Sequence, residues 1–174
     1  METEQLLRTF KKKLIFPPET LPHKPAAGKE EIMRIIPHRE PMLLLDSIDG
    51  LDFRHGLITG SRYMDPEDPV FSGHFPEYPV YPGSLEVEMI GQLGLCLYYF
   101  VMNETAVIGP SAEPVDLRAT RVLGAQYTAP LLPGAQALIL AKKLDYDGFF
   151  GTALGQVVSG GKVCCTAVGE VVFP

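Results

Sequence analysis

The amino-acid sequence predicts an α+β domain in which a bent antiparallel sheet wraps around one long central helix. Two observations lead to this prediction. Residues 84–102 are apolar on nearly every side and contain no proline, which is typical of a helix that is buried all round. Four strand-like segments follow it, at residues 117–127, 135–146, 149–158 and 162–173. One apolar helix and several long strands can bury their apolar faces together only if the sheet curls around the helix.

The N-terminal residues differ in composition from the rest of the chain. Residues 16–28 are rich in proline and lack periodicity, so we expect residues 1–28 to be an arm and residues 29–174 to be a single domain. Within the arm, residues 1–14 could form a short amphipathic helix. Residues 29–36 have helical spacing that stops before Pro37, because the residue before a proline is pushed out of the α region.

Two hairpins are expected on either side of the central helix. Residues 43–51 and 56–64 have strand patterns, with turn candidates at Asp49-Gly50 and at residues 54–56. Residues 159–162 contain two adjacent glycines, which can both take positive φ without a steric penalty. The last two strands are therefore expected to pair as a hairpin.

Composition and charge exclude several classes of protein. The 174 residues are 46% hydrophobic, which is enough for one compact domain with a core. The net charge is −6, and the only basic cluster is at residues 11–13. A protein that binds nucleic acid by neutralising phosphates needs a basic face, so we expect no nucleic-acid partner.

The cysteines and the N-terminus indicate a reducing compartment. Cys96, Cys164 and Cys165 have neither the spacing of a disulfide framework nor that of metal ligands, so we expect buried thiols. The first residues place acids before the basic cluster and contain no long apolar run, which is unlike a secretory signal. A cytoplasmic protein is the expectation.

The central helix approaches the length of a membrane span but includes charged residues. Glu86 and Glu88 lie inside it, and an acid near the centre of a bilayer costs about 2–3 kcal/mol. We therefore expect the core helix of a soluble protein and no membrane span.

A stiff connector precedes this helix. Pro76, Pro79 and Pro82 are spaced by three, which matches the polyproline II repeat and excludes a regular strand or helix. The connector can hold its two ends at a fixed separation. His74 lies at one end, and at the other end Gly83 opens the helix, where its backbone N–H can stabilise a developing negative charge on a carbonyl oxygen.

Two acids follow closely after Gly83, and they cannot serve one site. Gln92 is four residues after Glu88, so its amide can hydrogen-bond and orient that carboxylate. Glu86 lies about 200° away around the helix, so one of the two acids is expected to be structural. A histidine, a desolvated acid and a helix N-terminus are the groups needed to remove a proton next to a carbonyl while protonating a leaving group.

Other chemistries fit the sequence less well. The histidines show no ligand spacing, so no metal site is expected; they are His23, His38, His55 and His74. Ser84 lacks the G-x-S-x-G context of a serine hydrolase.

Three motifs resemble the 3-hydroxyacyl-[acyl-carrier-protein] dehydratases of fatty-acid synthesis. They are Ile36-Pro-His-Arg-Glu-Pro-Met-Leu-Leu-Leu-Asp46, Gly73-His-Phe-Pro-x-x-Pro-x-x-Pro-Gly83 and Glu88-x-x-x-Gln92. The resemblance covers the chain from about Ile32 to its C-terminus.

This resemblance implies a hot-dog fold, with active sites at the interface of a homodimer that could assemble further. His74 would abstract the C2 proton, and Glu88 of the partner chain would protonate the departing 3-hydroxyl. Gly83, Gln92 and Phe75 would be oxyanion or substrate-binding residues. No cofactor would be needed, because the substrate arrives as a phosphopantetheine thioester on acyl carrier protein.

Some positions depart from the pattern of this family. Glutamate at position 88 is similar to the dehydratase-only branch, but Glu77 and Glu86 are unusual, and residues 126–129 lack the arginines common there. A role in polyketide or aryl-polyene synthesis is therefore as open as one in fatty-acid synthesis. The alternatives are a hot-dog thioesterase and a non-catalytic acyl-binding or scaffold protein.

Overall fold

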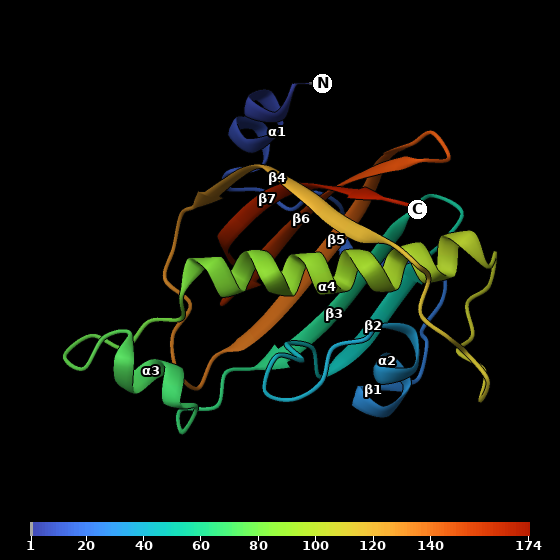
Figure 1. Cartoon of the computed structure of the whole chain (residues 1–174). Coiled ribbons are helices and arrows are strands. Elements are labelled where there is room, and N and C mark those ends of the chain that lie inside the picture. The colour runs from blue at the N-terminus through green and yellow to red at the C-terminus, as the bar shows by residue number, and fades with distance from the viewer. Residues whose placement is uncertain (1) are drawn as a thin grey trace.

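The computed structural model describes residues 2–174 as one antiparallel sheet with a long helix across it (Figure 1). Its helices are α1 (Thr3–Phe10), the 3-10 turn η1 (Pro18–Thr20), α2 (Lys29–Ile35), α3 (Pro69–Gly73) and α4 (Gly83–Met102). Its strands are β1 (Ala27–Gly28), β2 (Ser47–Asp52), β3 (Leu57–Tyr63), β4 (Arg118–Tyr127), β5 (Gln136–Tyr146), β6 (Phe150–Ser159) and β7 (Lys162–Val172). The seven strands pair in the order β1-β2-β3-β5-β6-β7-β4.

The predicted α+β architecture, a hot-dog-like fold, is confirmed. Helix α4 contacts every strand from β3 to β7, so the sheet curves around it. Two glycines of β6 let the helix approach closely. A Cβ at Gly155 would overlap Ile90, and one at Gly151 would overlap the ring of Tyr98. The central helix therefore lies against backbone at these points.

Most of α4 is buried inside the fold. By length and composition the helix could cross a membrane, but 61% of its apolar window is buried in the structure. This burial is what the core helix of a soluble protein shows.

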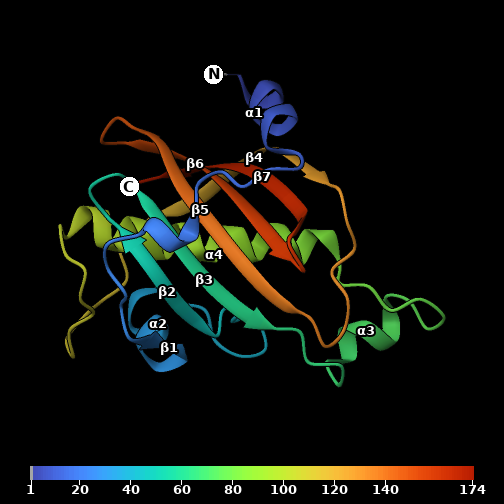
Figure 2. The same cartoon turned by 180° about the vertical axis from the view of Figure 1, so that it is seen from behind.

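The N-terminal arm covers the face of the sheet opposite α4 (Figure 2). Leu6, Ile15, Phe16 and Leu21 form a second apolar cluster there with side chains of β5, β6 and β7. The fully buried amide of Gln156 on β6 fixes the arm, since it accepts from Ile15 N at 3.0 Å and donates to the carbonyl oxygens of Phe10 and Lys13 at 2.9 Å each.

The first hairpin differs from its prediction. Residues 43–46 lie outside β2, because the backbone of this segment bonds to side chains, with Leu44 N donating to the Gln92 amide oxygen. Asp49-Gly50 is not a turn but lies inside β2, where the ladder shifts register between Ile48 and Gly50. The turn is at residues 53–56, and Gly56 has the positive φ (66°) that it requires.

One short helix was not expected, whereas the start of α4 and the last hairpin turn agree with expectation. The prediction did not include α3, which begins where the Asp68 side chain accepts from Val70 N at 3.0 Å. Helix α4 begins at Gly83, the residue expected to open it. The glycine turn between β6 and β7 forms as expected, with φ of 54° and 74° at Gly160 and Gly161.

Candidate active site

His74 follows α3 in a loop that hydrogen-bonds to itself. Its ring Nδ1 is 2.8 Å from Val80 O, and its own carbonyl accepts from Val80 N at 2.9 Å. A carbonyl oxygen can only accept, so Nδ1 must be the protonated nitrogen of the neutral ring. This leaves Nε2 with a free lone pair, as a general base requires.

Aromatic residues hold this loop on both sides. The ring of Phe75 stacks on His74 with 4.0 Å between centroids, and half of the Phe75 side chain is exposed. Tyr81 is buried against Phe71 and donates its N–H to Leu131 O at 2.8 Å. The proline connector is therefore anchored just before α4.

Gly83 is the first residue of α4 and lies against β4. A Cβ at this position would collide with the ring of Tyr127, so glycine lets the helix N-terminus approach that ring closely. The helix N-terminus consequently meets the end of β4 at this point.

Gln92 orients the carboxylate of Glu88, as the sequence predicts. Its amide nitrogen donates to Glu88 Oε1 at 2.8 Å and to Met42 O at 2.7 Å, and its amide oxygen accepts from Leu44 N at 2.8 Å. Only 1% of Gln92 is exposed. One buried amide thus fixes both the acid on α4 and the segment before β2.

His38, considered above only as a possible metal ligand, lies against the Glu88 carboxylate. Its Nε2 is 3.2 Å from Glu88 Oε1, the same oxygen that Gln92 contacts. The interaction with His38 is the largest influence on the Glu88 carboxyl and holds its pKa below the usual value, against the opposite effect of burial. The position of His38 inside the motif at residues 36–46 was the available signal.

Glu86 lies in a different environment from Glu88. It is 3% exposed, its Oε2 has no hydrogen-bond partner, and burial raises its pKa to about 8. Its charge influences the pKa of Tyr127 and Cys165 on the sheet side of α4. The two acids therefore face different surroundings, as helix geometry predicts.

A cavity of about 580 Å³ lies beside Glu88. Residues of α2, α4, β4, β6 and β7 line it, and most of them are apolar. His38, Glu88 and Gln92 form one polar part of its wall, and Asp116, Arg121 and Glu170 form another. This size suits a small-molecule ligand. His74, Phe75 and Gly83 do not line it, so one chain brings together the acid and its orienting groups but not the acid and the histidine.

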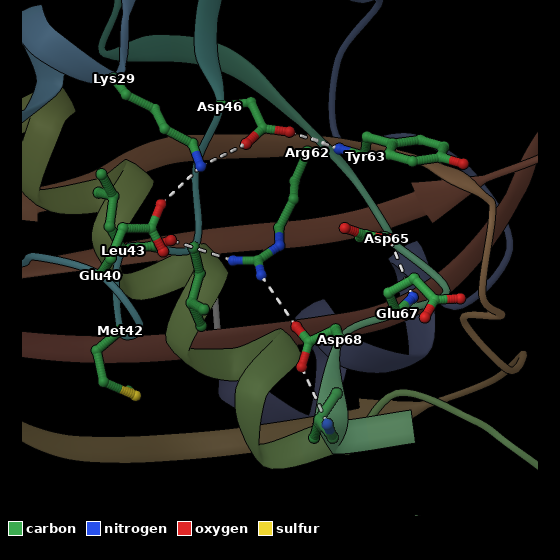
Figure 3. Close-up of polar contacts among 12 residues, drawn as sticks. Lys29, Glu40, Met42, Leu43, Asp46, Arg62, Tyr63, Asp65, Glu67 and Asp68 are labelled. Carbon is green, nitrogen blue, oxygen red and sulfur yellow. Dashed lines mark hydrogen bonds and ion pairs between the residues drawn. The ribbon is translucent and has the colours of Figure 1, made fainter. Parts of the chain in front are cut away.

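A polar network joins the segment before β2 to the start of α3 (Figure 3). Arg62 on β3 donates to Leu43 O at 3.2 Å and lies 3.5 Å from Asp68, the residue that caps α3. Lys29 pairs with Glu40 at 2.7 Å on the same side of the sheet. Arg62 therefore connects the segment that Gln92 binds with the helix that leads to His74.

The cysteines form neither a disulfide nor a metal site among the described residues. Cys96, Cys164 and Cys165 are free and buried, as predicted, and burial raises the pKa of Cys164 to about 11. Within residues 2–174, no group of three or more His, Cys, Asp or Glu side chains could hold a metal ion.

Comparison with known proteins shows which family the chain matches. Residues 36–167 match the FabA-like domain. The chain is 34% identical over 117 residues to a 3-hydroxyacyl-[acyl-carrier-protein] dehydratase FabZ of Campylobacter lari, covering 67% of this chain and 72% of that protein. It is 30% identical over 154 residues to the FabZ of Chlamydia muridarum, covering 86% and 93%. Among solved structures, the dehydratase heterocomplex ApeI:P from Xenorhabdus doucetiae has a TM-score of 0.61 at 17% identity, covering 82% of this chain and 90% of that one.

Proposed function

Because this chain belongs to the FabA-like domain family, we propose that it converts (3R)-hydroxyacyl thioesters on acyl carrier protein into trans-2-enoyl thioesters and water. The observation that supports this best is the pair of oriented groups. His74 has a free Nε2, and Glu88 is held at the wall of an apolar cavity. An elimination next to a thioester needs a base and an acid of this kind.

In the proposed reaction, His74 Nε2 takes the proton from C2 of the substrate. The electron pair of that bond forms the C2–C3 double bond as the C3–O bond breaks. Glu88 gives its proton to the departing hydroxyl, which leaves as water. The Gly83 N–H at the start of α4 stabilises the negative charge that develops on the thioester oxygen. No cofactor takes part, since no electrons leave the substrate.

The protonation of Glu88 depends on how the site is covered. In the isolated chain its side chain is 37% exposed, and the interaction with His38 keeps its pKa low. Removal of water by a bound acyl chain and a second subunit favours the neutral carboxyl, because burial penalises the charged form. Closure of the site therefore promotes the form that can donate a proton.

We propose that the active site is shared between two copies of the chain. The cavity contains Glu88 but not His74, and the exposed strand β4 ends the sheet with an unpaired edge. Val122 on this strand is 62% exposed. A symmetric homodimer across this edge would place His74 of one protomer near Glu88 of its partner, and further assembly of dimers is compatible with it.

The proposal extends to the partner and the cellular setting. Acyl carrier protein or another acyl thioester carrier is the partner, in fatty-acid synthesis or in related polyketide or aryl-polyene synthesis, in the cytoplasm. The division into an arm (residues 1–28) and a domain (residues 29–174) is supported by the family match, which begins at residue 36.

A direct assay tests this function. A 3-hydroxybutyryl thioester is offered to the purified protein, and enoyl formation is followed by ultraviolet absorbance while free thiol is measured in parallel. We expect enoyl product without thiol release. Thiol release without enoyl product would indicate the thioesterase alternative, and neither signal would indicate a non-catalytic acyl-binding protein.

A further inference from the structure

A basic hollow of about 440 Å³ lies beside the end of β4. Its charged side chains come from two distant parts of the sequence, Lys11 and Lys12 in the arm and Lys162 at the start of β7. They surround the backbone of residues 127–129. This strand end has no lysine or arginine of its own from residue 122 to residue 134, so the arm and the β6–β7 turn supply the positive charge.

The charge of these lysines is not neutralised within the described chain. All three are exposed, and none of the ion pairs found among residues 2–174 includes Lys11, Lys12 or Lys162. The chain as a whole has a net charge of −6. A local positive patch on an acidic protein favours binding to an acidic surface.

The arm holds its two lysines at a defined place. Gln156 donates to the carbonyl oxygens of Phe10 and Lys13, the residues on either side of them. Helix α1 packs on β4, and a Cβ at Gly124 would overlap Thr3 and Leu7. The backbone of residues 11–12 is thus fixed at both ends, which reduces the ordering cost of binding.

The hollow lies next to the proposed reaction site. Tyr127 lines it, and the ring of the same tyrosine lies against Gly83 at the N-terminus of α4. A protein bound over the lysines would therefore stand beside the helix end at which the thioester oxygen is expected.

We propose that Lys11, Lys12 and Lys162 form a docking surface for the acidic face of an acyl carrier protein. The inference rests on the proposed function and adds a role for the N-terminal arm. The arm would position the carrier so that its phosphopantetheine thioester can reach the active site, while the chemistry itself is left to the groups on α4 and the His74 loop.

Charge reversal with a matched control tests this surface. The double variant Lys11→Glu/Lys12→Glu and the single variant Lys162→Glu are compared with Lys24→Glu/Arg54→Glu. The control residues are exposed, and Lys24 lies beside residues 106–108, which follow the C-terminal end of α4. Residues 106–108 are separated from Gly83 by the 20 residues of that helix, or about 30 Å, and Arg54 lies in the turn between β2 and β3.

Three substrates distinguish the possible outcomes: 3-hydroxybutyryl groups on acyl carrier protein, on coenzyme A and on N-acetylcysteamine. We expect Lys11→Glu/Lys12→Glu to raise KM for the carrier-bound substrate by about ten-fold or more, with kcat unchanged. Lys162→Glu should act in the same direction, and the control should have no effect. Both small thioesters should be turned over as by the wild type.

The failure of this inference can be told apart from the failure of the proposed function. Equal kinetics of all variants on the carrier-bound substrate would overturn the docking surface while leaving the dehydratase intact. The docking surface would also be overturned if the lysine variants raised KM for the coenzyme A thioester as much as for the carrier-bound substrate, because the lysines would then bind a phosphate group. If the wild type dehydrated no thioester, the proposed function would fail. Carrier binding measured by fluorescence anisotropy would still test the surface, which an unchanged Kd in Lys11→Glu/Lys12→Glu would refute.

Discussion

Glu86 and Glu88 are two residues apart on α4, yet their pKa values shift in opposite directions. Burial without a partner raises the pKa of Glu86, whereas His38 and Gln92 lower that of Glu88. Helix geometry alone could predict that the two acids face different surroundings. The expectation that Glu88 is the desolvated acid was wrong: Glu86 is 3% exposed, whereas the Glu88 side chain is 37% exposed. Which acid is buried depends on where β4 and β7 pass the helix.

Glu86 should make the protein less stable as the pH rises. Its pKa is about 8 in the folded chain and 4.5 as the ordinary value. The contribution of Glu86 to the free energy of unfolding is therefore fully present below pH 4.5. It is lost as the pH rises towards about 8, at up to about 1.4 kcal/mol per pH unit. In Glu86→Gln this component disappears. Denaturant unfolding of the wild type and of Glu86→Gln at several pH values between 5 and 8 measures this pH dependence. If the free energy of unfolding changed with pH in the same way in both proteins, the raised pKa of Glu86 would be contradicted.

His38 is expected to act as a positioning residue for Glu88. In His38→Asn the interaction that lowers the pKa of Glu88 is weakened, so this pKa should rise towards its ordinary value. We expect kcat to fall by about ten-fold, because the carboxyl loses one of the two side chains that orient it, and this misplacement outweighs the larger protonated fraction. A carbon-13 NMR titration of the Glu88 carboxyl separates this role from a structural one. An unchanged Glu88 pKa would show that His38 only fills space.

At the scale of elements, the sequence predicts the long helix and the later strands well. Their apolar patterns are long and uninterrupted, and the glycine turn before β7 is a strong local signal. The segment at residues 43–46 could not be predicted in the same way. Its apolar run is typical of a strand, but the buried Gln92 amide, distant in sequence, bonds to its backbone instead.

Glycines on α4 leave room for the substrate along this helix. Gly91 and Gly94 both line the cavity beside Glu88, and a Cβ at either would meet no atom outside the helix within 4 Å. Their spacing of three places them on one face. We infer that an acyl chain lies along this face.

Gly94→Leu should therefore shorten the accepted acyl chain. Because leucine is a better helix former than glycine, unfolding is not the expected cause of any loss. The ratio of kcat/KM for a ten-carbon to a four-carbon 3-hydroxyacyl substrate should fall by about ten-fold, the scale of one or two excluded methylene groups. Gly109→Ala, outside the cavity, is the control. A ratio equal to that of the wild type would mean that the chain runs elsewhere.

At the scale of the whole molecule, the sequence could predict a wrapped helix but not what covers the outer face of the sheet. The arm has no periodic pattern beyond α1, and its anchor, Gln156, is one polar residue in a mostly apolar strand. The separation of His74 from the Glu88 cavity, which the family resemblance implies, is seen within one chain only in the three-dimensional arrangement. That separation is the main reason to propose a site shared between two chains.

The most direct test of the shared site is complementation between two inactive variants. His74→Ala lacks the base, and Glu88→Gln keeps the shape and the bond to Gln92 but loses the titratable proton. Each alone should lose about 10²–10⁴ in kcat. The two are unfolded together and reassembled.

In each mixed dimer, one of the two sites receives His74 and Glu88 intact. Random pairing makes about half of the dimers mixed, so about one quarter of the wild-type activity should return. Sedimentation and mass spectrometry establish that mixed dimers have formed. If they have formed and activity does not rise above that of the separate variants, the two residues do not meet across a dimer interface.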